Sequence, residues 1–231
     1  MTFLSLTLAC SLLFSAPVAP KAYFCTVEGR TFRYERRWAD SSKRDGSIKW
    51  IHNLTIDEVR QEQGKTIVGY SSAFSTPDGR KMYGGAIALR CEIDESSDVE
   101  VDLAQSFASV LSSTLGLKTE SEPCMSVLQS DISPATSLEN ADFQIRCGPL
   151  KYNVRIDGRK FEGRQSLTLP CGIFDCIVVS EHKVEKGPGR NRETYSRTWY
   201  ARGVGMVRHD TYDAARRLQT SEVLVQITDR L

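Results

Sequence analysis

The alternation of large apolar and charged side chains is the feature that most restricts the fold of this chain. In Thr31–Trp38 the aromatic positions are separated by arginine and glutamate, and Ile48–Asp57 repeats the alternation. A period of two residues puts successive side chains on opposite faces of a β-strand. Turn sequences such as Asp45-Gly46 and Pro77-Asp78-Gly79 separate the runs, and these residues favour tight reversals. The pattern therefore predicts long antiparallel hairpins.

One segment has the spacing of an amphipathic helix instead. Apolar residues recur at helical intervals from Leu103 to Leu115, between Asp102, which can cap the first turn, and Gly116, which can end the last. The segment that follows, 118–140, is rich in Ser, Pro, Glu and Thr, and we expect a loop there. The sequence thus predicts an all-β, mainly antiparallel domain over 23–231 with one main helix, in two halves of about 23–117 and 137–231.

Charge argues against a nucleic-acid partner. The 231 residues include 30 Lys+Arg and 29 Asp+Glu, a formal net charge of +1. Nucleic-acid binding depends on a basic patch that neutralises phosphates, and acidic residues interleave the basic stretches here. We therefore expect no nucleic acid among the partners.

The first residues have the features of an export signal. The run Phe3–Ala16 is apolar and Pro17 follows it, and an apolar core of this length suits a signal peptide better than a membrane-spanning helix. We expect a cleaved signal in residues 1–22, with lipidation at Cys10 or an uncleaved anchor as alternatives. The mature chain would then have no transmembrane segment and would be periplasmic, extracellular or attached to the cell envelope.

Six cysteines remain when the signal is removed. An even count in an exported chain favours disulfides, whereas a zinc site would need paired cysteines or histidines at ligand spacing. Fifteen pairings exist for six cysteines, and their order along the chain favours neighbours. We therefore expect three bridges and no functional free thiol, with the pairs Cys171–Cys176, Cys124–Cys147 and Cys25–Cys91.

Two motifs in the second half carry a resemblance to a known family. Ser166–Glu181 reads SLTLPCGIFDCIVVSE and Thr198–Asp213 reads TWYARGVGMVRHDTYD. Their order, with a hairpin between them, resembles the DUF3108-like group of bacterial envelope proteins, closely over Ser133–Ile227 and more loosely over Phe24–Leu117. Cys171 departs from the family pattern, which has a small residue there.

The resemblance implies a strongly curved antiparallel sheet or half-barrel, similar in shape to envelope lipid carriers. It implies no established activity and offers no catalytic residues to carry over.

Catalytic and metal-binding patterns are weak in this sequence. The chain lacks the G-x-S-x-G motif of serine hydrolases. Its histidines, His52, His182 and His209, lie on separate predicted strands, so nothing indicates a shared metal site. We expect a protein that is not an enzyme and has no cofactor.

Aromatic residues on the predicted strands are the best candidates for a ligand site. A half-barrel that does not close leaves a concave face that the helix could cover, and the candidate groove residues are Trp50, His52, Trp199, Tyr200 and Met206. Since neighbours on a strand point to opposite faces, only one of Trp199 and Tyr200 can point inward, and we expect Trp199. The alternative is that Tyr200 lines a cavity with Met206.

The sequence therefore favours a non-catalytic protein that binds an apolar or lipid-like envelope molecule. The alternative is a structural or assembly component of the envelope that contacts a protein or polysaccharide partner. A hydrolase ranks third, because no nucleophile, base and oxyanion donor can be assembled from the motifs.

Overall fold

A large, mainly antiparallel β-sheet, a small two-stranded sheet and one helix make up the described residues, which confirms the predicted fold class at that level. The computed structural model describes residues 20–41, 44–134, 136 and 138–230. Most of the predicted signal peptide, including Cys10, lies outside the described residues. The elements run along the chain as β1 (Thr31–Trp38), β2 (Asp40–Ser41), β3 (Arg44–Asp45), β4 (Ile48–Glu62), β5 (Lys65–Ser75), β6 (Lys81–Ile93), β7 (Val99–Asp102), α1 (Leu103–Leu115), β8 (Thr119–Ser121), β9 (Met125–Leu128), β10 (Ala141–Cys147), β11 (Leu150–Leu169), β12 (Gly172–Gly187), β13 (Arg190–Ala201), β14 (Gly205–Tyr212) and β15 (Leu218–Thr228).

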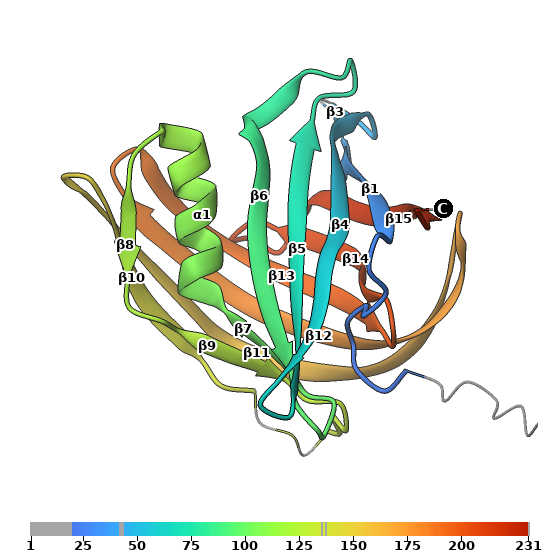
Figure 1. The fold of residues 1–231 in the computed structure, drawn as a ribbon. Coiled ribbons are helices and arrows are strands. Elements are labelled where there is room, and N and C mark those ends of the chain that lie inside the picture. The colour runs from blue at the N-terminus through green and yellow to red at the C-terminus, as the bar shows by residue number, and fades with distance from the viewer. Residues whose placement is uncertain (1–19, 42–43, 135, 137, 231) are drawn as a thin grey trace, which may run out of the picture.

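The main sheet has thirteen strands in the order β8-β10-β11-β12-β13-β14-β15-β1-β4-β5-β6-β7-β9. Pairing of β15 with β1 joins the strands of the two halves of the chain, from Thr31 opposite Thr228 to Trp38 opposite Thr220. Figure 1 shows β4, β5 and β6 crossing in front of β11, β12 and β13, so that the two parts of the sheet form two layers. The core and the candidate site lie between these layers.

The half-barrel expectation needs correction. The strand order ends at two edges, β8 and β9, so the hydrogen-bonded ladder does not close. Instead of one strongly curled sheet, the two layers cross each other and pack face to face. Side chains from both layers share the largest core cluster, with Tyr34 from β1 and Val178 from β12 among its members. A hydrogen bond from the Tyr34 hydroxyl to the carbonyl oxygen of Met206, 2.9 Å long, also joins β1 to β14.

The helix begins and ends where the sequence predicts. Asp102 caps α1 by accepting a hydrogen bond at Oδ1 from the Gln105 amide, 3.1 Å away, and such caps stabilise the first turn. Gly116 ends it in the left-handed region at φ 64°, which glycine adopts without a steric penalty. The helix contacts β6, β8, β9 and β10, and it therefore lies between the two edges of the sheet.

The segment 118–140 is not simply a loop, contrary to the sequence-based expectation. It contains β8 and β9, which pair with β10 and β7 respectively. Both strands are short, three and four residues long. Their extended conformation depends on the edges of the sheet that they meet, which local composition does not encode.

No disulfide joins the six described cysteines in the structure. Cys176 lies four residues along β12 from Gly172, a distance of about 13 Å in an extended strand, whereas bridged Cα atoms lie within about 7 Å. The Cys171 thiol instead faces the carbonyl oxygen of Leu224, 3.5 Å away.

The pair Cys124–Cys147 is also too far apart for a bridge. The Cys124 thiol lies beside the Asp142 backbone, and Cys147 is five residues further along β10, about 16 Å in an extended strand. Cys25 and Cys91 are both fully buried in the main core, where the Cys25 sulfur accepts a hydrogen bond from Val27.

Candidate functional site

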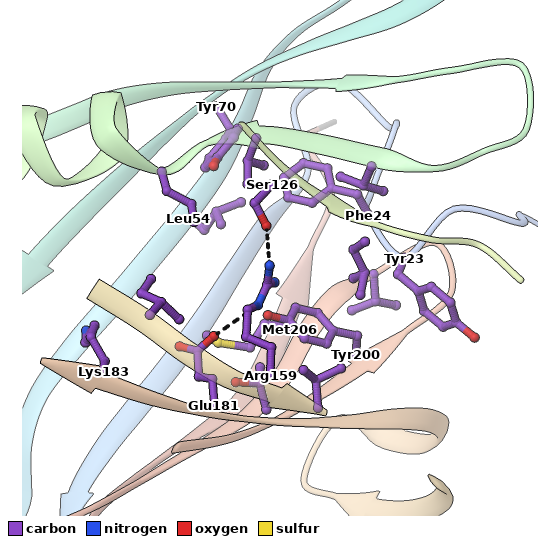
Figure 2. A pocket seen from close by; sticks show the side chains of 18 of the residues that line it. Tyr23, Phe24, Leu54, Tyr70, Ser126, Arg159, Glu181, Lys183, Tyr200 and Met206 are labelled. Carbon is purple, nitrogen blue, oxygen red and sulfur yellow. Dashed lines mark hydrogen bonds and ion pairs between the residues drawn. The ribbon is translucent and has the colours of Figure 1, made fainter. Parts of the chain in front are cut away.

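A cavity of about 290 Å³ lies between the two layers of the sheet. One wall comes from β1, β4, β5 and β7, and the other from β11, β12 and β13. Helix α1 contributes Leu103 and Phe107 to the lining, so the helix covers part of this space. Figure 2 shows Leu54 and Tyr70 on one side of the cavity and Tyr200 and Met206 on the other. Ligand sites in proteins are typically clefts of about 300–1,000 Å³, so this cavity suits a small ligand.

Two of the five candidate groove residues line the cavity. Tyr200 on β13 and Met206 on β14 lie opposite each other in the sheet and both face the cavity. Trp199 is buried in the main core at 4% exposure, where its indole donates a 2.9 Å hydrogen bond to Gln165. The structure therefore has the arrangement weighed as the alternative, with Tyr200 rather than Trp199 in the cavity wall.

Trp50 and His52 lie away from the cavity. Trp50 packs edge-on against Phe74, with ring centroids 6.5 Å apart, and the Arg36 guanidinium lies 4.9 Å from its ring centroid. His52 is stacked between Tyr34 and Phe74, at 5.1 and 4.3 Å. Neither residue belongs to the lining.

A buried polar network surrounds His52. Its Nδ1 lies 2.8 Å from Glu222 Oε1, and its Nε2 lies 3.1 Å from Ser72 Oγ. Arg36 Nη1 lies 3.0 Å from the other oxygen of Glu222. All four groups face the space between the layers, and His52, Ser72 and Glu222 are each less than 9% exposed.

The charges in this network set two unusual pKa values. Burial by itself would raise the pKa of Glu222, but the hydrogen bond from His52 and the charges of His52 and Arg36 lower it to about 2. Burial and the neighbouring Arg36 charge lower the pKa of His209 to about 4. Glu222 is therefore a buried anion with partners, while His209 is held in its neutral form.

Ser72, His52 and Glu222 follow each other in the order of a serine hydrolase triad. The nucleophile of such a triad must reach substrate and must lie close to donors for an oxyanion. Ser72 is only 5% exposed and its partner His52 lies beneath two aromatic rings. None of the three residues lines the cavity, so the geometry favours a structural network.

The polar part of the cavity centres on Arg159 of β11. Its Nη1 donates to Ser126 Oγ at 2.9 Å and to the carbonyl oxygen of Glu139 at 3.0 Å, and Glu181 Oε2 lies 3.7 Å from its Nε. Lys183 also belongs to the lining, and its ammonium lies 4.9 Å from the centroid of the Phe107 ring. Burial raises the pKa of the Tyr200 hydroxyl in the same cavity to about 12.

Sequence reasoning missed this charged part of the cavity. Arg159 lies in a charged run, and the register of β11 shifts between Asp157 and Lys160. A bulge interrupts the alternation that assigns side chains to faces, so the pattern gave no reason to place Arg159 inside. The helical spacing of Leu103 and Phe107 was the one sequence signal for the cavity, because it predicts an apolar helix face that packs against other residues.

The described part of the chain contains no group of three or more His, Cys, Asp and Glu side chains that could hold a metal ion. His182 lies 2.7 Å from Asp157 and 3.0 Å from Glu193, in a cluster of polar side chains. Among the described residues, no helix is both long and apolar enough to cross a membrane.

A family model described as DUF3108-like matches residues 28–224. The chain belongs to the DUF3108-like family. The match includes β1, most of β15 and every strand between them, so it covers both walls of the cavity. No curated protein matches the chain.

Two solved structures share the fold of this DUF3108-like protein. A proposed lipoprotein from Parabacteroides distasonis superimposes with a TM-score of 0.72 at 18% identity, over 90% of this chain and 98% of that one. A proposed exported protein with a YmcC-like fold from Bacteroides fragilis has a TM-score of 0.71 at 16% identity, over 91% of this chain and all of that one, 100%. At these identities the likeness establishes the fold.

Proposed function

We propose that this DUF3108-like protein is an exported, non-catalytic protein that binds a small apolar or lipid-like molecule of the cell envelope between its two sheet layers. The observation that carries the proposal is the cavity lined by Leu54, Tyr70, Tyr200 and Met206. Its lining is mostly apolar, with a few polar groups, which is the usual composition of a ligand site. Export is supported by the descriptions of its two structural neighbours as a proposed lipoprotein and a proposed exported protein.

The experiment is to fill the cavity and measure ligand uptake. Val101 lines the cavity from β7, and Val127 on the adjacent strand β9 is 38% exposed. We expect native mass spectrometry to find a co-purifying small molecule on the wild-type protein and on V127W, and little or none on V101W. Uptake of the apolar fluorescent probe N-phenyl-1-naphthylamine should follow the same order, with V101W weaker by about ten-fold or more.

Matched melting temperatures for the two variants would show that both fold. A wild-type protein that carries no small molecule and takes up no probe would overturn the proposal. Equal uptake by V101W and V127W would place the ligand elsewhere on the molecule.

One observation favours a second candidate function, an assembly component of the envelope. Ile173, at the end of the β11–β12 hairpin, is 73% exposed, and it borders an open hollow of about 660 Å³ with Phe174 and Arg202. Exposed apolar side chains at the rim of a hollow are common in protein contacts. Substitution I173D should then abolish co-purification of a partner protein and leave small-molecule uptake unchanged.

A further inference from the structure

An arginine inside the cavity has a hydrogen-bond donor without a partner. The Arg159 side chain is 11% exposed and spans the cavity from β11 to Ser126 on β9 (Figure 2). Its Nε is buried and has no hydrogen-bond partner among the described residues. The nearby Glu181 oxygen, 3.7 Å away, is beyond hydrogen-bond distance.

An unpaired buried donor is unfavourable in a folded protein and usually marks a missing partner. Three of the five guanidinium hydrogens belong to Nε and Nη1, and Nη1 already has two acceptors in Ser126 and Glu139. An acceptor placed beside Nε would satisfy the remaining one of these three hydrogens. Arg159 is part of the cavity lining, so an acceptor bound in the cavity would lie beside its guanidinium group.

The charges of the lining favour an anionic acceptor. The lining contains the two cations Arg159 and Lys183 and the single carboxylate Glu181. Glu185, which lies 3.1 Å from Lys183, is outside the lining. Glu185 therefore neutralises Lys183 from outside the lining, and the guanidinium of Arg159 is the group that can stabilise an anionic head group in a cavity partly removed from water.

The size of the cavity limits the rest of the ligand. A volume of about 290 Å³ corresponds to about ten water-sized groups, at roughly 30 Å³ each. Leu54, Val101 and Met206 also line the cavity, so a hydrocarbon chain can lie against them.

We propose that the ligand is a single-chain carboxylate of about ten non-hydrogen atoms, with its head group on Arg159 and its chain against Leu54, Val101 and Met206. This inference rests on the proposed function. The carboxylate accepts charge-assisted hydrogen bonds from the guanidinium group, and such bonds are stronger than those between neutral groups. Glu181 and Ser126 hold the guanidinium in position.

The test compares octanoate with 1-octanol, which have the same chain and differ in the head group, by calorimetric titration at pH 7.4. We expect octanoate to bind about ten-fold or more tightly, because the head group and not the chain decides the difference. The R159Q variant should lose this preference while it keeps its affinity for 1-octanol. The matched control is R155Q, because Arg155 is on the same strand with a side chain 60% exposed, and it should keep the preference.

The outcomes separate this inference from the function on which it rests. Equal affinities of the wild-type protein for 1-octanol and octanoate, or an unchanged preference in R159Q, would contradict the proposal of a carboxylate ligand. Either result would leave the proposal that the protein binds an apolar molecule unaffected. A protein that binds neither molecule would overturn both.

Discussion

Arg36 and Glu222 form an ion pair that is almost completely removed from water. Their side chains are 14% and 6% exposed, and the charged atoms lie 3.0 Å apart. Taking one charge away from such a pair leaves the other buried without compensation. The pair on the neighbouring residues, Arg37 and Glu35, is on the outer side of the same strand, with the arginine 52% exposed.

We expect Glu222→Gln to lower the free energy of unfolding by about 3–5 kcal/mol, because the negative charge that pairs with Arg36 is removed and one of the two oxygens that face His52 and Arg36 becomes an NH2 donor. Urea denaturation measures this. The control Glu35→Gln removes a surface pair and should cost about 0–1 kcal/mol. Similar losses in the two variants would show that the buried network contributes no more than a surface pair.

His209 predicts how stability depends on pH. Its Nδ1 lies 2.9 Å from Thr198 Oγ1, and its pKa is lowered to about 4, from 6.5 in an unfolded chain. The unfolded state therefore binds more protons between these two values, so stability falls as the pH falls from about 6.5 to about 4. We expect a loss of about 1–3 kcal/mol in this range, which His209→Gln should remove.

Unfolding curves at several pH values test this. Glu222 contributes to the pH dependence of stability at lower pH, between about 4.5 and about 2, because its carboxylate loses its partners only when it is protonated. Parallel pH profiles for the wild type and His209→Gln above pH 4 would contradict the assignment.

At the scale of elements, the long β11–β12 hairpin depends on one close approach between strands. A Cβ at Gly187 would lie 2.9 Å from Tyr152 Cε1 and 3.0 Å from the Lys151 carbonyl oxygen. Tyr152 is buried in the core beneath α1, at 6% exposure. The absence of a side chain at position 187 therefore lets the two strands and the tyrosine ring pack together.

We expect Gly187→Ala to destabilise the protein by about 1–3 kcal/mol, the usual cost of overpacking. Gly69 on β5 is the matched control, because a Cβ there would meet Glu58 at an ordinary 3.6 Å. Gly69→Ala should be neutral or stabilise by about 0.4–1 kcal/mol, since alanine restricts the unfolded chain. Thermal melts of both variants decide, and a Gly187→Ala protein as stable as the wild type would contradict the packing argument.

At the scale of the whole molecule, the cysteine positions argue against two of the three predicted bridges. We expect peptide mapping under non-reducing conditions to find neither Cys171–Cys176 nor Cys124–Cys147, because each pair is separated by about 13 Å or more along extended strands. Cleavage ahead of Asp175 separates the first pair into two peptides. A covalent link between these peptides would mean that the β11–β12 turn differs from the structure described here.

Local chemistry in the sequence determined most of the elements of this protein, with β8 and β9 as exceptions. Alternation in Thr31–Trp38 predicts β1, and the pair Asp102 and Gly116 predicts both ends of α1, because periodicity and capping act within a few residues. The family resemblance, carried by the two motifs of the second half, holds over residues 28–224. Each of these signals is contained in a short stretch of chain.

The tertiary structure alone decided which of these elements meet. His52 lies against Glu222, 170 residues away along the chain, and Arg159 enters the cavity because a bulge interrupts β11. The crossing of the two sheet layers sets the volume between them and puts Tyr200, rather than Trp199, in its wall. Alternation along a strand shows which of its side chains share a face of the sheet. It does not show which strand pairs with it or which layer faces it, and the cavity depends on both.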